Sequence, residues 1–131
     1  MSTIFSKIVR GEIPCYKIAE DENFLAFLDI SPLAMGHTLV IPKKEVDYIF
    51  DIDDEMTGKM WIFAKKMAKA IKIAVPCKKV GIAVIGLEVA HAHIHLIPIN
   101  RVDDINFARE KLTPSSVELA EMAKKIQEKI N

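Results

Sequence analysis

The chain has 131 residues and carries 18 lysines and arginines against 18 aspartates and glutamates, so that its formal charge is zero. Half of its residues are hydrophobic and 27% are charged, which is typical of a globular protein, and the length fits one domain over residues 1–131. The neutral charge argues against a protein that coats nucleic acid or a membrane surface, and no apolar run approaches the roughly 18 residues of a membrane span. Cys15 and Cys77 form no paired motif, and the N-terminus lacks a long apolar stretch, so we expect a cytoplasmic protein with reduced thiols.

The first part of the chain predicts a short helix followed by three strands. Thr3 is suited to cap the helix and Gly11 to end it. The pattern then changes to the alternation that is typical of strands, with an acidic turn at residues 20–23 and breaks around Pro32 and Gly36. The expected strands span residues 15–21, 23–30 and 37–42.

The second part predicts a long helix, two strands and a last helix. Apolar residues repeat at helical spacing over residues 53–74, and we interpret them as a core-facing stripe with the lysines on the solvent side. Strands are expected over residues 79–86 and 92–99, and Thr113 and Pro114 are suited to open the last helix. Strands joined by tight turns, with helices beside them, indicate an α+β domain with a mostly antiparallel sheet.

Three of the four histidines stand at alternate positions, namely His91, His93 and His95. Within a strand, residues i, i+2 and i+4 point to the same side, so we expect these imidazoles to form a row. Burying three imidazoles without partners is costly, and the row therefore indicates a functional site.

Two kinds of chemistry suit such a row, and the spacing alone does not decide between them. Neutral imidazoles at alternate strand positions can coordinate zinc and leave one position for water. Alternatively, one imidazole attacks an electrophilic phosphorus while its neighbours bind the oxygens or move protons. His37 can serve either chemistry, and Glu88 lies close in sequence and can add a carboxylate.

The stretch over residues 91–97, His-Ala-His-Ile-His-Leu-Ile, alternates histidines with apolar residues. Residues 4–14, 27–32 and 36–43 precede it. Together, in this order and at this spacing, these segments resemble the histidine triad family, in its Hint-like branch, over about residues 3–98.

This resemblance implies a five-stranded antiparallel sheet flanked by helices, in a protein that is usually a homodimer. It also implies hydrolysis or nucleotidyl transfer at the α-phosphate of a nucleoside phosphoramidate or a dinucleoside polyphosphate. The expected partner is a purine nucleotide or nucleotide conjugate, without a metal or another cofactor. Neither nucleic acid nor a membrane is expected as a partner.

The resemblance also assigns roles to individual residues. His93 is expected to be the nucleophile and to form a nucleotidyl-histidine intermediate. His95 is expected to bind a phosphate oxygen, while His91 and His37 orient the site and stabilise charge. Asp29 matches the carboxylate that binds the ribose hydroxyls. The apolar pocket for the base is matched by Phe5, Ile8, Phe27 and Ile30.

Three features depart from the family's pattern. Many bacterial relatives open with Cys-x-x-Cys, which helps to bind a structural zinc ion, but Thr3 and Ser6 stand here and no such site is expected. Leu87 and Glu88 replace a Gln-Ser or Gln-Thr pair. Three interpretations of Glu88 stay open: an acid whose pKa is raised by burial, a charge that repels the nucleotide, or a residue that faces solvent. Residues 113–130 predict an extra helix, whose apolar face is buried on its own subunit or across a dimer interface.

Two other functions stay open from the sequence. One is a nucleotide-binding protein on the same fold that turns over poorly, because the polar residues before the triad are missing. The other is a metal enzyme or metal-binding protein that uses the histidine row.

Overall fold

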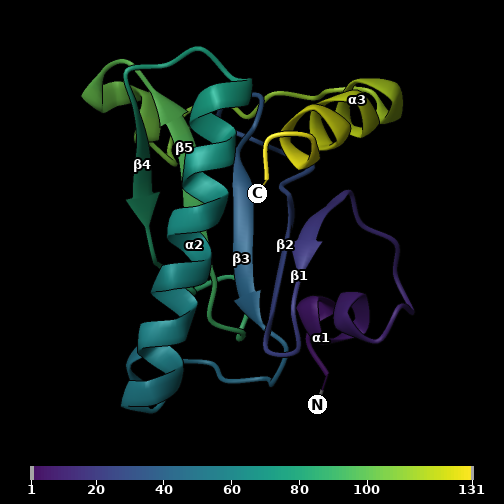
Figure 1. Ribbon diagram of the computed structural model, residues 1–131, viewed down its shortest axis with the longest axis vertical. Coiled ribbons are helices and arrows are strands. Elements are labelled where there is room, and N and C mark those ends of the chain that lie inside the picture. Colours follow the sequence, from purple (N-terminus) through teal and green to yellow (C-terminus); the bar gives the residue numbers. More distant parts are fainter. Residues whose placement is uncertain (1, 131) are drawn as a thin grey trace.

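The computed structural model describes residues 2–130. Its strands form one open sheet, and its helices pack beside this sheet (Figure 1). The elements are, in chain order, α1 (Ile4–Val9), β1 (Lys17–Glu20), β2 (Phe24–Leu28), β3 (Thr38–Pro42), a 3-10 turn (Ile49–Asp51), α2 (Asp54–Ala74), β4 (Lys79–Ala83), β5 (Ile94–Ile99), a second 3-10 turn (Val102–Ile105) and α3 (Ser116–Gln127).

The strands of the described residues pair in the order β1-β2-β3-β5-β4, and every neighbouring pair is antiparallel. This confirms the expected α+β fold with a five-stranded antiparallel sheet. β1 and β4 are its edge strands. β4 ends at Ala83, before the expected end at Gly86, because its last pair is Ala83 with His95, next to the first residue of β5. The chain then turns at Gly86 with a φ of 70°, a conformation that favours glycine.

The long helix α2 covers one face of the sheet, as Figure 1 shows. Asp53 caps it by accepting a hydrogen bond from the Met56 N–H at 2.8 Å. Met60, Met67 and Ile71 are buried against the sheet, which confirms the expected core-facing stripe. The lysines of the helix are exposed, namely Lys59, Lys65, Lys66, Lys69 and Lys72. Within residues 2–130, no helix has both the length and the apolar character of a membrane span.

The last helix, α3, starts at Ser116, so the prediction that Thr113 and Pro114 open it is wrong. Ser115 is the cap: its hydroxyl accepts the Glu118 N–H at 3.1 Å, and the Glu118 carboxylate accepts the Ser115 N–H at 2.9 Å. This reciprocal pair stabilises the helix end more than a lone threonine cap does.

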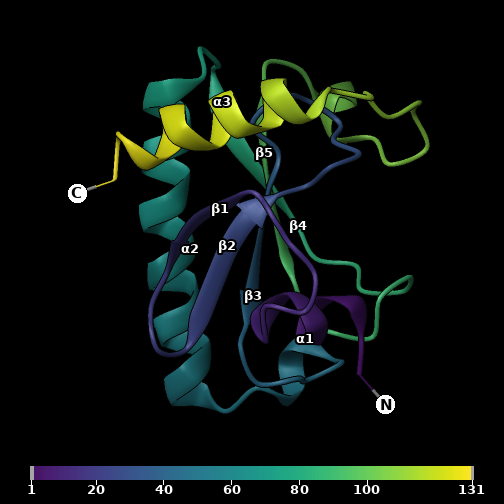
Figure 2. The ribbon, with the colours of Figure 1, turned by 90° about the vertical axis from the view of Figure 1, so that its right-hand side faces the viewer.

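The apolar side of α3 is buried within its own subunit. Leu119, Ala123 and Ile126 belong to the same core as α2 and the sheet. The helix contacts α2, β1 and β2, and Figure 2 shows it crossing α2. Of the two placements open from the sequence, the structure therefore selects burial on the same chain.

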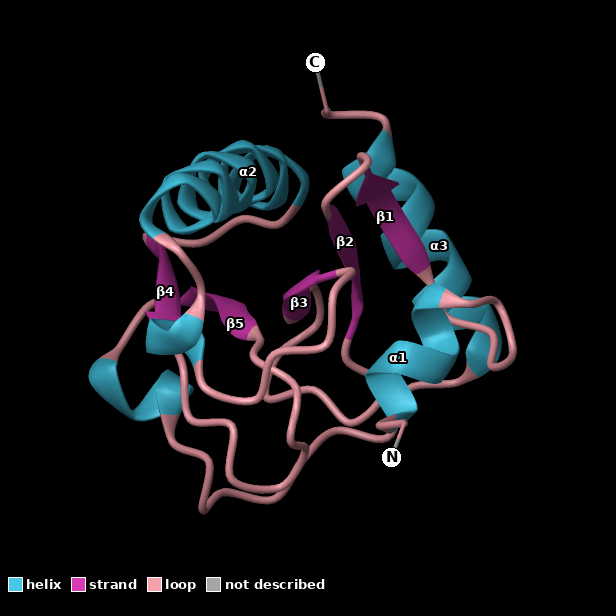
Figure 3. Cartoon of the chain, turned by 90° about the horizontal axis from the view of Figure 1, so that it is seen from below, coloured by secondary structure: helices cyan, strands magenta, loops and turns pink. Residues whose placement is uncertain are grey.

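The opposite face of the sheet carries a second apolar cluster and the short helix α1, as the view in Figure 3 shows. Phe5 from α1 packs edge-to-face on Phe27 from β2, with ring centroids 5.6 Å apart. Leu39 of β3 belongs to this cluster and lies opposite His95 of β5. Because opposite residues of an antiparallel pair share a face, this face carries the histidine site.

Candidate active site

The triad histidines do not form the strand row that the alternation predicts. β5 begins at Ile94, which pairs with Val40, so His91 and His93 precede the strand and only His95 lies within it. The segment before the strand is held instead by the Ala92 N–H, which donates to the Val46 carbonyl at 2.6 Å. The triad positions are nevertheless all buried, and so is His37.

His37 and His95 form a hydrogen-bonded pair whose proton positions follow from the surrounding groups. The Leu33 N–H donates to Nδ1 of His37 at 3.0 Å, so that the hydrogen of the neutral ring lies on Nε2. This Nε2–H donates to Nδ1 of His95 at 2.9 Å. Neutral His95 therefore carries its own hydrogen on Nε2, where it is a donor for a ligand oxygen.

Burial keeps this pair uncharged at neutral pH. Desolvation, together with the neighbouring histidines, lowers the pKa of His37 to about 3 and that of His95 to about 4. The pair is thus a chain of neutral donors with fixed direction. It offers hydrogen bonds to an anionic ligand without carrying a charge of its own.

His93 presents the opposite ring geometry. Its Nδ1–H donates to the His91 carbonyl at 2.7 Å, which leaves a lone pair on Nε2. The ring lies edge-to-face against Phe5 at 5.0 Å and against His95 at 4.8 Å between centroids. A neutral imidazole held in this tautomer has the form that a nucleophile requires.

His91 makes its ring contacts within the protein. Its Nε2–H donates to the Pro42 carbonyl at 2.8 Å, and its Nδ1 lies 3.1 Å from Oγ1 of Thr3 and 3.4 Å from Oγ of Ser6. Both ring nitrogens therefore face protein groups, and the side chain has no exposed surface. The orienting role expected of His91 fits its backbone carbonyl, whereas a direct contact of its ring with a phosphate does not fit.

The ribose candidate, Asp29, follows β2 and lies beside the histidine pair. Its Oδ1 accepts the Ser31 N–H at 2.9 Å, and its Oδ2 lies 3.7 Å from Nε2 of His37. Burial raises the pKa of Asp29. The carboxylate is half-buried, and it therefore has surface left for a ligand.

The four residues expected around the base are only partly brought together. Phe5 and Phe27 are buried in the cluster beside the histidines, and Ile8 packs against that cluster. Ile30 is 64% exposed and does not belong to it. The Glu88 side chain is also exposed, so it is not the buried acid that one interpretation required.

Residues 10–102 match the HIT domain. The chain belongs to the histidine triad (HIT) family. A HIT-like protein from Borreliella burgdorferi is 40% identical over 113 residues, which span 81% of each chain. Adenosine 5′-monophosphoramidase of Saccharomyces cerevisiae is 42% identical over 96 residues, which span 72% of this chain and 61% of the enzyme. The crystal structure of a HIT-like protein from Bartonella henselae has a TM-score of 0.85 at 36% identity, with 98% of this chain and 97% of the other covered.

A structural zinc site of the Cys-x-x-Cys kind, which the resemblance brings into question, does not fit the residues of this chain. Thr3 and Ser6 stand at the two cysteine positions, and their hydroxyls hydrogen-bond to His91 and Glu45. Zinc in structural sites is held by thiolates and imidazoles, not by neutral hydroxyls. The expectation of no zinc at this place therefore agrees with the donor set.

A second group of candidate metal ligands lies at the histidine pair. Ligand atoms of Asp29, His37 and His95 fall within 4.8 Å of one another. The Leu33 N–H, however, occupies Nδ1 of His37 and places the ring hydrogen on Nε2, the atom that faces the other two residues. A metal ligand needs a free lone pair there, so this tautomer opposes metal binding.

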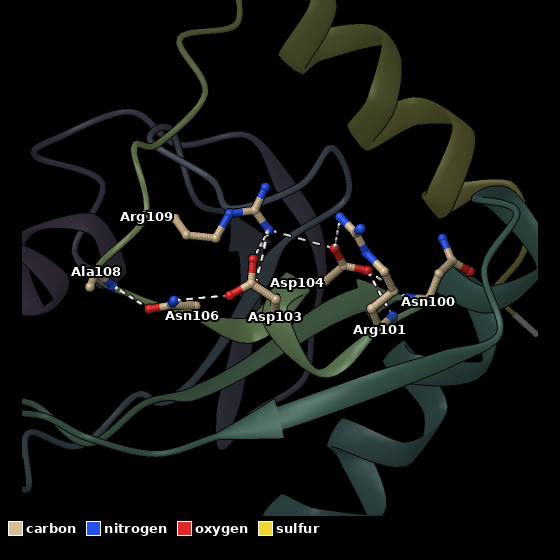
Figure 4. Close-up of polar contacts among 7 residues, drawn as sticks. All are labelled: Asn100, Arg101, Asp103, Asp104, Asn106, Ala108 and Arg109. Carbon is tan, nitrogen blue, oxygen red and sulfur yellow. Dashed lines mark hydrogen bonds and ion pairs between the residues drawn. The ribbon is translucent and has the colours of Figure 1, made fainter.

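Phe107 is a residue of the site that no sequence motif indicated. Its ring packs edge-to-face on His95 at 4.8 Å and on His37 at 6.3 Å between centroids. Phe107 lies in the loop that follows strand β5. Arg109 holds this loop by a hydrogen bond to the Asp103 carbonyl and an ion pair with Asp104, whose carboxylate also accepts backbone N–H groups (Figure 4). This network presents Phe107 to the histidine pair.

Lys111 is the second residue that the sequence did not indicate. Its Nζ donates to the Phe107 carbonyl at 2.6 Å and lies 5.9 Å from the centroid of the Phe107 ring. Its positive charge contributes to the lowered pKa of His37 and opposes the raised pKa of Asp29. A cation therefore stands near a site whose histidine pair is neutral.

The neutral state of buried His37 predicts that this HIT protein loses stability in mild acid. In the unfolded chain His37 takes up a proton at its ordinary pKa of 6.5, but in the fold it does so only near 3. Between these values the unfolded state binds more protons, so the free energy of unfolding falls as the pH is lowered. We expect urea unfolding between about pH 7 and pH 4 to show this decline, and His37→Gln to make it shallower. Equal pH slopes for the two proteins would contradict the assignment.

Proposed function

We propose that the chain is a nucleotide hydrolase or nucleotidyl transferase in which Nε2 of His93 attacks the α-phosphorus of a nucleoside phosphoramidate or a dinucleoside polyphosphate. The observation that carries the proposal is the pair of opposite tautomers. His93 has its lone pair on Nε2, and His95 has a hydrogen on Nε2. A nucleophile and a donor for the phosphoryl oxygen thus lie side by side on adjacent rings.

The first step forms a bond between Nε2 of His93 and the α-phosphorus and breaks the bond from phosphorus to the leaving group. The leaving group takes a proton from solvent. The ring of His93 then carries positive charge, and the His91 carbonyl stabilises this charge through the Nδ1–H. In the second step a water oxygen bonds to phosphorus, the phosphorus–nitrogen bond breaks and a proton leaves, which releases the nucleoside monophosphate and neutral His93.

The apolar cluster beside the triad suits a flat base. Phe5 and Phe27 supply buried aromatic rings and Ile8 a partly buried aliphatic side chain, and Asp29 offers carboxylate oxygens to ribose hydroxyls. Lys111 offers a positive charge to a phosphate chain. A purine nucleotide or nucleotide conjugate is therefore the proposed substrate class, and the proposed reaction needs no metal or other cofactor.

A nucleotide-binding protein with weak turnover is the second candidate. It is favoured by the residues before the triad, because Leu87 is 89% exposed and the neighbouring Glu88 is exposed too. Neither provides the polar contact that a Gln-Ser pair is expected to give to phosphate or leaving group. The two candidates differ only in rate, so that an activity measurement separates them.

The test uses an adenosine 5′-phosphoramidate with a fluorogenic amine, with and without a chelator. Chelator-resistant release of the amine is the expected result and supports hydrolysis through the histidines. Binding of a non-hydrolysable analogue without release favours the weakly active binder. Release that stops with the chelator overturns the metal-free reaction.

We also propose a homodimer that forms at the edge strand β4. A cavity of about 560 Å³ lies where the chain leaves β4, and its lining includes Phe50, Trp61, Ile85 and Leu87 together with Ala92. Ile82 of β4 is half-exposed as well. An unpaired strand edge beside an apolar surface suits the same surface of a second copy.

Substitution of Ile82 by lysine tests the dimer, because a charge on an edge strand opposes pairing with another strand. We expect sedimentation velocity to show a dimer for the unchanged chain and a monomer for Ile82→Lys. Val117→Lys, at an exposed position of α3, is the matched control and is expected to stay dimeric. An unchanged chain that sediments as a monomer contradicts the dimer.

A cytoplasmic location is part of the same proposal and rests on the composition and the free thiols of Cys15 and Cys77.

A further inference from the structure

The N-terminal turn of α1 is joined to the triad through hydroxyl groups. Oγ1 of Thr3 lies 3.1 Å from Nδ1 of His91, across 88 positions of the sequence. Ser6 Oγ lies 3.4 Å from the same nitrogen and 2.5 Å from Oε1 of Glu45. The Thr3 N–H also donates to Oε1 of Glu45, at 3.1 Å. Three segments that are distant in the chain thus meet at one buried imidazole.

The chemistry of the partners fixes the direction of each bond. A carbonyl only accepts, so that Nε2 of His91 carries the hydrogen that is donated to Pro42, and Nδ1 must accept. The Glu45 carboxylate is an acceptor, so the Ser6 hydroxyl donates to it. The Thr3 hydroxyl, which accepts the Ser6 N–H, is then the donor to Nδ1 of His91. Oγ of Ser6 is a second acceptor for the Thr3 hydroxyl, but at 3.4 Å it is farther away than Nδ1 of His91 at 3.1 Å.

The cluster acts where the sheet does not hold the chain. Ladder pairing of β5 with β3 starts at Ile94, so the backbone of His91 is outside it. That backbone carbonyl is the acceptor for the Nδ1–H of His93. Its position depends on two anchors. One is the hydrogen bond from the Ala92 N–H, which belongs to the same planar peptide unit, to the Val46 carbonyl. The other is the set of contacts that holds the His91 ring.

We propose that Thr3, Ser6 and Glu45 are positioning residues that hold the His91 carbonyl in place and thereby select the Nδ1–H tautomer of His93. The effect runs from the Glu45 carboxylate to the two hydroxyls, then to the His91 ring and finally to the carbonyl. The consequence for catalysis rests on the proposed function of His93, whereas the effect on the tautomer does not.

The experiment reads the tautomer and the rate separately. Long-range nitrogen-15 spectra of the imidazoles report the tautomer of His93, and steady-state kinetics report kcat and KM. Thr3→Val removes the hydroxyl and keeps the shape, and we expect it to produce a mixture of His93 tautomers. We also expect kcat to fall about 10-fold with little change in KM, since small misplacements of reacting groups reduce rates strongly.

Control variants distinguish positioning from general damage. Thr3→Ser keeps the hydroxyl and is expected to retain the tautomer and most of kcat. Thr113→Val, at an exposed position before α3, is expected to change neither. Glu45→Gln keeps an oxygen that accepts from Ser6, so its effect is expected to be smaller than that of Glu45→Ala.

A single Nδ1–H tautomer of His93 in folded Thr3→Val overturns the proposal. If Thr3→Val does not fold, the spectrum of Glu45→Ala decides in the same way, because Glu45 is exposed and its loss leaves no cavity in the core. If the unchanged chain has no activity, the proposed function fails, but the tautomer of the variants still tests the positioning.

Discussion

Replacing His93 by alanine is expected to lower turnover of the phosphoramidate by about 10³-fold or more, as the loss of a nucleophile does in other enzymes. Affinity for a non-hydrolysable nucleotide analogue is expected to stay within about threefold, because Phe5, Phe27 and Asp29 remain. Single-turnover kinetics and calorimetric titration measure the two quantities. Equal losses of affinity and rate would indicate that His93 binds the nucleotide and does not react with it.

A control for this prediction is chemical rescue. His93→Gly leaves a gap beside Phe5 and His95 that a free imidazole can enter. Added imidazole is expected to restore part of the turnover in His93→Gly and to leave the unchanged chain unaffected. Substantial turnover by His93→Ala without imidazole would show that another group attacks the phosphorus.

Replacing Ile126 by alanine is expected to lower the free energy of unfolding by about 2–5 kcal/mol. Ile126 lies in α3 and is completely buried in the core shared with α2 and the sheet. Deleting its methyl and methylene groups leaves a cavity that the packed core cannot close. Urea denaturation followed by circular dichroism measures the change.

The matched control lies in the same helix. Val117 is 63% exposed, and Val117→Ala is expected to change the free energy of unfolding by no more than about 0.5 kcal/mol. We also expect one cooperative transition for the unchanged chain, because α3 shares its core with the rest. Two separate transitions would contradict a single domain over residues 1–131. An Ile126→Ala variant as stable as the control would contradict the packing of Ile126 in the shared core.

The strands and helices could be predicted from local signals. The capping side chain of Thr3, the stop at Gly11 and the apolar stripe of residues 53–74 depend on neighbours within a few positions, and each is confirmed. The predicted start of α3 is too early because Thr113–Pro114 matches a helix opening, whereas the helix begins at Ser116. Ser115 is the cap instead, because it forms a capping box with Glu118 that contains two hydrogen bonds, whereas a lone cap forms one.

The four histidines, Asp29 and Phe5 could be named as candidates from the sequence, but their geometry could not be predicted. Alternation suggested that the histidines share one strand face, but β5 begins only at Ile94, and the His91 carbonyl is used to orient His93. The tautomers depend on Leu33, Pro42 and other groups that only the fold brings to the rings. Sequence spacing carries no information on such contacts.

Two further parts of the site lacked a sequence signal for a different reason. Phe107 and Lys111 stand in an irregular loop, and the Asp104–Arg109 network determines where that loop lies. Glu45 lies in a loop after β3, and its contacts with Ser6 and Thr3 join distant segments. In both cases the residue types are common on protein surfaces, so only their placement distinguishes them.

The central claim is that His93 attacks phosphorus and becomes covalently attached to the nucleotide. Rapid mixing with the adenosine phosphoramidate, quenching at alkaline pH and peptide mass spectrometry measure this attachment directly. We expect an adenylyl group on His93 that forms before product is released and that is absent from His93→Ala. Turnover without any adenylylated peptide in the quenched samples, or an adenylyl group on His91 or His95, would contradict it.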